Sequence, residues 1–170
     1  MIDVVGCVHD IQSSDPVPLL GGGPDVKEQR DHFCHLLEGI FSEARADLVT
    51  EEWGRKSESF AQILKKKLGF RYLPINTTDE DLDGLGIPSD YMVLGRYTEE
   101  QKREWLRLRE GLMLERIRSA RGAAESVVVI CAFDHLQALA EKLAKGEIVK
   151  QVDYKGECWY RHDVFFPPSF

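Results

Sequence analysis

The chain of 170 residues has few cysteines and no long apolar run, and both absences restrict what it can be. Its four cysteines, Cys7, Cys34, Cys131 and Cys158, lack the CxxC spacing of a zinc ribbon and the density of a disulfide framework. Cys7 and Cys131 fall within apolar patterns, which favours buried thiols over nucleophiles. No apolar run approaches the roughly 20 residues of a membrane span. The first residues also lack the pattern of a secretory signal, so we expect a cytoplasmic protein.

An excess of positive charge is also absent. The chain has 22 Lys and Arg residues against 29 Asp and Glu residues, which makes its net charge −7. This balance argues against nucleic-acid or anionic-membrane binding as the main activity. Neither the Walker spacing nor the dinucleotide-binding spacing occurs. We therefore expect a small-molecule or peptide substrate as the partner, with a homo-oligomer as a candidate assembly.

What the sequence does contain is an alternation of strand and helix patterns along its whole length. The apolar runs at 2–5 and 127–131 are continuous rather than alternating, which is typical of buried parallel strands. A capping box at Thr98 and Gln101 predicts a long helix that ends at Gly122. These patterns predict one α/β domain, with a mostly parallel β-sheet flanked by helices.

Two segments outside these patterns have a less regular composition. The loop 13–24 is rich in turn residues and is a candidate lid over a site. The tail 163–170 is apolar and contains two prolines, so it cannot be helical throughout. We expect the tail to pack on the body of the domain or on a partner. Both segments are assigned to the single domain, which spans 1–170.

A candidate site arises because two of the apolar strands lead into histidines, His9 and His135. Ligands of parallel α/β sheets gather beyond the carboxyl ends of the strands, where both histidines should lie. Glu51 and Glu52 end another strand pattern at the same edge, and strand alternation sends their side chains to opposite faces. One glutamate should join the histidines while the other is solvated. The sequence does not decide which, and we favour Glu51.

The long helix carries two arginines, Arg109 and Arg116, in the middle of a broad apolar face. That face is formed by Trp105, Leu106, Leu108, Leu112, Met113, Ile117 and Ala120. An unpaired buried charge is very costly, so each arginine must be paired or must reach a polar cavity. A glutamate at the sheet edge or an anionic substrate group would satisfy one of them. Arg116 is therefore a candidate substrate-binding residue, and a purely structural ion pair is the alternative.

A weaker pattern occupies residues 79–90, whose acidic side chains imitate the spacing of a calcium loop. A strand pattern rather than a helix precedes this segment, Pro88 interrupts it, and Asp90 replaces the usual final glutamate. Solvated turn chemistry is therefore the preferred interpretation.

Together the motifs resemble the superfamily that joins TraB/PrgY and Tiki proteins, erythromycin esterases and the haem-binding lipoprotein ChaN. Members share an early GxxH, a glutamate after the next strand, an arginine followed by a methionine on a helix, and a late GxxH-like histidine. The counterparts here, in the same order, are Gly6 to His9, Glu51 or Glu52, Arg109 through Met113, and Ala132 to His135. The late motif departs from the pattern, because Ala132 stands in place of glycine.

The resemblance implies hydrolysis, either metal-dependent proteolysis as in the Tiki proteins or ester and lactone cleavage as in the esterases. In the first case His9, Glu51 and His135 could bind a divalent metal (Mn, Co or Zn) that activates water. In the second, His9 would act as the general base, Glu51 or Glu52 would orient it, and Arg109 would stabilise the oxyanion. The residues do not decide between the two mechanisms.

Two functions of other classes remain open at this stage. The haem-binding relative suggests ligand binding, with histidines on the iron and Trp53 or Trp105 against the ring. The chain could also be a non-catalytic regulatory module that keeps the fold, because one scaffold hosts many functions.

Overall fold

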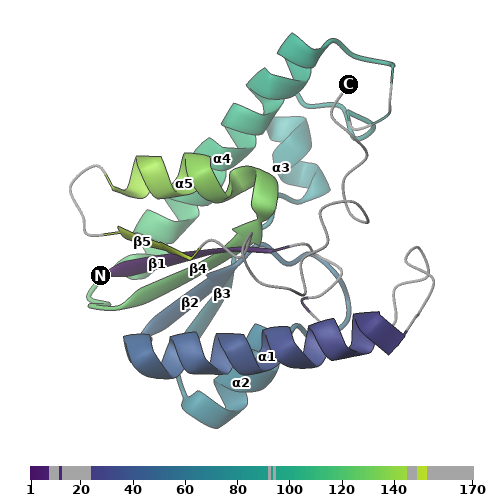
Figure 1. Cartoon of the computed structure of the whole chain (residues 1–170). Helices are drawn as coiled ribbons and strands as arrows, with labels where there is room; N and C mark the ends of the chain where they lie inside the picture. Colours follow the sequence, from purple (N-terminus) through teal and green to yellow (C-terminus); the bar gives the residue numbers. More distant parts are fainter. Residues whose placement is uncertain (8–11, 13–23, 92, 94, 145–148, 153–170) are drawn as a thin grey trace.

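The computed structural model describes residues 1–7, 12, 24–91, 93, 95–144 and 149–152, and Figure 1 shows their arrangement. The predicted site residue His9 lies outside the described residues, as does the tail 163–170. The predicted lid loop is also outside them up to Pro24, where the first helix begins.

Strands and helices alternate along the described chain. They are β1 (Ile2–Cys7), α1 (Pro24–Ala44), β2 (Leu48–Glu51), α2 (Phe60–Leu68), β3 (Arg71–Pro74), α3 (Asp79–Gly84), α4 (Glu99–Arg121), β4 (Val127–Ala132), α5 (Phe133–Leu143) and β5 (Val149–Val152). The strands of this part form a five-stranded sheet in the order β3-β2-β4-β1-β5. Every neighbouring pair is parallel, which confirms the predicted α/β fold.

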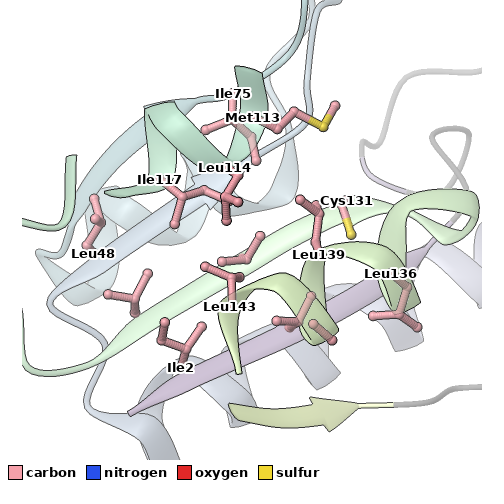
Figure 2. Close-up of a cluster of buried hydrophobic side chains, with 14 of the residues drawn as sticks. Ile2, Leu48, Ile75, Met113, Leu114, Ile117, Cys131, Leu136, Leu139 and Leu143 are labelled. Carbon is pink, nitrogen blue, oxygen red and sulfur yellow. The ribbon is translucent and has the colours of Figure 1, made fainter. Parts of the chain in front are cut away.

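The helices cover both faces of the sheet, with α1 and α2 on one side and α4 and α5 on the other (Figure 1). One core, under α1 and α2, packs Phe33, Phe41 and Phe60 against the sheet. Figure 2 shows the second core, where Met113 and Ile117 of α4 and the leucines of α5 meet the opposite face. Because β1 and β4 are buried on both faces, their sequences run as continuous apolar stretches. None of the described helices is long and apolar enough to cross a membrane.

Local signals placed both ends of α4 correctly. The Thr98 hydroxyl accepts a hydrogen bond from the backbone N–H of Gln101, whose side chain accepts one in return from the N–H of Thr98. Gly122 ends α4, as predicted. Thr78 and Asp81 form the same kind of capping box at α3, so part of the calcium-like segment is a capped helix.

The buried face of α4 differs from the predicted one. Its buried residues are Glu110, Met113, Leu114 and Ile117, whereas Leu108 is 36% exposed. The spacing of the buried residues, three, four and seven apart, is that of one helical stripe. Met113 and Ile117 are buried as predicted, and Leu108 is not, because α5 packs on the side of α4 that carries Glu110.

Gly6 has a packing role that the sequence did not reveal. A Cβ atom at this position would lie 2.7 Å from Cδ2 of Leu136 on α5. The glycine therefore lets α5 approach β1 closely. This close packing positions the first turn of α5, which carries His135.

Candidate active site

Glu52 is the centre of a cluster of charged side chains at the carboxyl edge of the sheet. Its Oε1 atom lies 3.2 Å from Nη2 of Arg109 on α4 and 3.5 Å from Nε2 of His135 on α5. Its Oε2 atom accepts a hydrogen bond of 2.8 Å from the backbone N–H of Ala132 at the end of β4. Glu52, rather than the favoured Glu51, is thus the glutamate that meets Arg109 and His135.

Glu51 points to the other face of the sheet, as strand alternation requires. Its carboxyl group accepts hydrogen bonds from Ser59, Tyr72 and Gln12 and has no exposed surface. The expectation that the second glutamate is solvated was therefore wrong. Burial raises the pKa of Glu51 to about 7, although the three hydrogen bonds oppose this increase.

Arg109 connects α4 to the loops at the same edge. Its Nε atom donates to the Thr77 hydroxyl at 3.0 Å, Nη1 donates to the Tyr91 hydroxyl, and Nη2 donates to Glu52. All three nitrogens of the guanidinium thus have acceptors, which confirms that this arginine is paired. The geometry orients the group with one edge towards Glu52.

Arg116 lies apart from this cluster. Its Nη2 atom donates to both carboxylate oxygens of Asp81, at 2.7 and 2.8 Å, and Nη1 donates to the carbonyl oxygen of Asn76. The hydrogen bonds from Arg116, with those from Thr78, lower the pKa of Asp81 to about 2. Arg116 is thus paired, as expected, but it serves α3 and not the site around Glu52.

Glu110 is a site residue that the sequence analysis missed. This buried carboxylate lies between α4 and α5, where one oxygen is 3.4 Å from Nδ1 of His135 and the other accepts from Nζ of Lys142 at 2.7 Å. Burial raises the pKa of Glu110, but the hydrogen bonds from His135 and Lys142 outweigh it and leave the pKa below its usual value. The signal that could have found it is its helical spacing with Met113 and Ile117.

His135 is therefore held between two carboxylates. Glu52 faces one ring nitrogen and Glu110 faces the other, and the ring itself is only 3% exposed. A chain of alternating basic and acidic side chains thus runs from Arg109 through Glu52, His135 and Glu110 to Lys142. Such a network fixes the orientation of the Glu52 carboxylate.

A cleft opens next to Glu52. Its volume is about 190 Å³, and it is lined by Glu52, Trp53, Gly54, Arg55, Asn76, Thr77 and Arg109. These residues come from the loops after β2 and β3 and from α4. His135 is not among the lining residues, so it lies behind Glu52 as seen from the cleft.

The metal set predicted from the sequence does not fit the described residues. Glu51 and His135 lie on opposite faces of the sheet, so they cannot share an ion without rearrangement. Glu52 does meet His135, but its oxygens already face Arg109 and the Ala132 N–H. Across the part of the chain that the structure describes, no three or more His, Cys, Asp or Glu side chains are grouped to hold a metal ion.

The cysteines of the sheet are not nucleophiles. Cys7 and Cys131 are fully buried, and burial raises the pKa of each thiol well above its ordinary value. The reactive thiolate is therefore disfavoured at both positions, which confirms the interpretation as buried thiols.

No known protein family, curated protein or solved structure matches this chain. The family resemblance stated above thus stays a hypothesis from the motifs. The candidate site accordingly stands on its geometry, namely a buried carboxylate, an arginine and a histidine that come together at the edge of a cleft.

Proposed function

We propose that the chain is a hydrolase of small esters or peptides that acts at the cleft beside Glu52. The observation that carries this proposal is the position of Glu52, which is buried, contacts Arg109 and His135, and also lines the cleft. A cleft lined by a few convergent polar groups is a typical place for a binding or active site. The family resemblance points to the same reaction class.

The reaction needs a base for water and a donor for the oxyanion. Glu52 would accept a proton from water as the water oxygen forms a bond to the acyl carbon. The bond from that carbon to the leaving oxygen or nitrogen then breaks, and the leaving group takes the proton. The products are a carboxylic acid and an alcohol or amine. Nη1 and Nη2 of Arg109 each carry a second N–H, which can stabilise the oxyanion.

Residues behind the cleft would set the position of this base. His135 holds Glu52 from the side of α5, Glu110 holds His135, and Lys142 in turn holds Glu110. We treat these as positioning residues, because His135 and Glu110 are buried. The motif residue His9 stays in the proposal as a second candidate base.

Two variants of the proposal are less well supported. Metal assistance by His9, Glu51 and His135 conflicts with the separation of Glu51 from His135. The proposed reaction therefore uses Glu52 and Arg109 without a metal. Haem binding conflicts with the size of the cleft, since about 190 Å³ is below the usual volume of sites for drug-sized ligands, roughly 300–1,000 Å³.

The test is a hydrolysis screen with nitrophenyl esters, lactones and short peptides, followed by Glu52→Gln. We expect wild-type activity in the screen and a kcat at least about 100-fold lower in Glu52→Gln, because general-base catalysis contributes that much or more. Glu58→Gln is the matched control, since Glu58 is exposed and pairs with Lys66. His9→Ala tests the second base in parallel.

Thermal unfolding of each variant would show whether it is folded. If Glu52→Gln is folded and keeps wild-type kcat, or if the wild type cleaves nothing in the screen, the proposed function is wrong.

A further inference from the structure

The charges that line the cleft are unequal. Two arginines, Arg55 and Arg109, line the cleft together with one acidic residue, Glu52. Arg109 and Glu52 form an ion pair of 3.2 Å, and the guanidinium carbon of Arg55 lies 5.6 Å from the centre of the Trp53 ring. A lining with an excess of cationic groups attracts anions and repels cations.

The other polar groups that line the cleft also favour an anionic ligand. The Asn76 amide and the Thr77 hydroxyl can both donate hydrogen bonds, and Arg109 has N–H groups beyond those it uses on Thr77, Tyr91 and Glu52. Guanidinium groups bind carboxylates through paired hydrogen bonds. The lining thus provides several donors for the oxygens of a ligand.

Steric features limit the size of the ligand. A Cβ atom on Gly54 would lie 3.0 Å from Nδ2 of Asn76, so the glycine keeps the two walls close together. The volume of about 190 Å³ corresponds to roughly six water molecules at about 30 Å³ each. Trp53 supplies an apolar wall for the hydrocarbon part of a ligand.

We infer that the cleft selects small organic anions with a free carboxylate, which Arg55 binds, over neutral compounds of the same shape. For a substrate, this carboxylate would be separate from the ester or amide that is cleaved. The inference rests on the proposed function for the reaction, but anion binding can be measured without any turnover.

The first experiment is titration calorimetry with glutarate and with its neutral diamide, glutaramide. We expect glutarate to bind at least about tenfold more tightly than glutaramide. Arg55→Gln should weaken glutarate binding about tenfold, because a lost charged hydrogen bond is worth about 1.4 kcal/mol or more. Lys56→Gln is the matched control, an exposed cation next in sequence that does not line the cleft, and should change affinity less than twofold.

Three results would overturn the inference. They are no binding of glutarate, equal binding of glutarate and glutaramide, and equal losses in Arg55→Gln and Lys56→Gln. The last result would mean that general electrostatic attraction, rather than the cleft, holds the anion.

A second experiment separates this inference from the proposed function. Monomethyl glutarate and dimethyl glutarate carry the same ester, but only the first has a free carboxylate. We expect a kcat/KM at least about tenfold higher for the monoester, and a raised KM with little change in kcat in Arg55→Gln. If glutarate binds but neither ester is cleaved, the inference stands without the hydrolase. If both esters are cleaved equally well, the hydrolase stands and the inference is wrong.

Discussion

The two faces of the sheet give two adjacent glutamates opposite environments. Under α1 and α2, Glu51 is surrounded by the neutral donors Ser59, Tyr72 and Gln12. Under α4 and α5, Glu52 faces the guanidinium of Arg109 and the ring of His135. Both carboxyl groups are buried, and Glu52 also lines the cleft described above.

This difference shows how surroundings assign roles to identical side chains. Burial raises the pKa of Glu51 to about 7, although its neutral donors oppose this increase. Glu52 has the charge of Arg109 beside it, which offsets the cost of burying a carboxylate. We therefore assign Glu51 to the support of the fold and Glu52 to chemistry.

The largest change in stability is expected when the positive charge beside Glu52 is removed. Arg109→Met should lower the free energy of unfolding by about 3–5 kcal/mol, because it leaves a buried carboxylate without its charged partner. Urea unfolding measures the change. Arg107→Met is the control, since its pair with Glu104 is 73% and 59% exposed and should matter little. Equal losses in the two variants would contradict this account of Glu52.

A smaller effect is expected when Glu51 is made neutral. Because the pKa of Glu51 is higher in the folded chain, about 7 against 4.5, its contribution to stability should be fully present below pH 4.5 and lost as the pH rises through 7. This difference of about 2.5 corresponds to about 3 kcal/mol. Glu51→Gln should therefore be more stable than the wild type at pH 8, by up to that amount, and similar to it at pH 4.5.

Unfolding by urea across this pH range would test the prediction for Glu51. Glu58→Gln, at an exposed site, should keep the wild-type pH profile. An unchanged profile in Glu51→Gln would show that Glu51 is ionised in the folded chain throughout the range.

The smallest expected effect sharpens the comparison at Ser59, which both caps α2 and donates to Glu51. Ser59→Ala should lower the free energy of unfolding by about 1–2 kcal/mol. It should also move the pH dependence of stability to higher pH, because the hydrogen bond from Ser59 lowers the pKa of Glu51 and the variant no longer has it. Thr98→Ala removes the same kind of cap from α4, where the hydroxyl bonds Gln101 instead of Glu51. This control should cost about 1 kcal/mol without moving the pH profile.

Much of the fold could be predicted because its signals are local. The continuous apolar runs of β1 and β4 indicated strands buried on both faces, and the capping box at Thr98 located the start of α4. The buried face of α4 could not be predicted in the same way. Which side of α4 is buried depends on where α5 packs. In the folded chain this side carries Glu110 and not Leu108.

For the candidate site, the sequence by itself determined that Glu51 and Glu52 lie at the carboxyl edge and point to opposite faces, since strand geometry alternates residue by residue. Only the tertiary structure decided which of them meets Arg109 and His135. That choice depends on which face of the sheet α4 and α5 cover, and hence on contacts between segments far apart in the chain. Local sequence patterns carry no record of such contacts, so the different surroundings of Glu51 and Glu52 became distinguishable only in the folded chain.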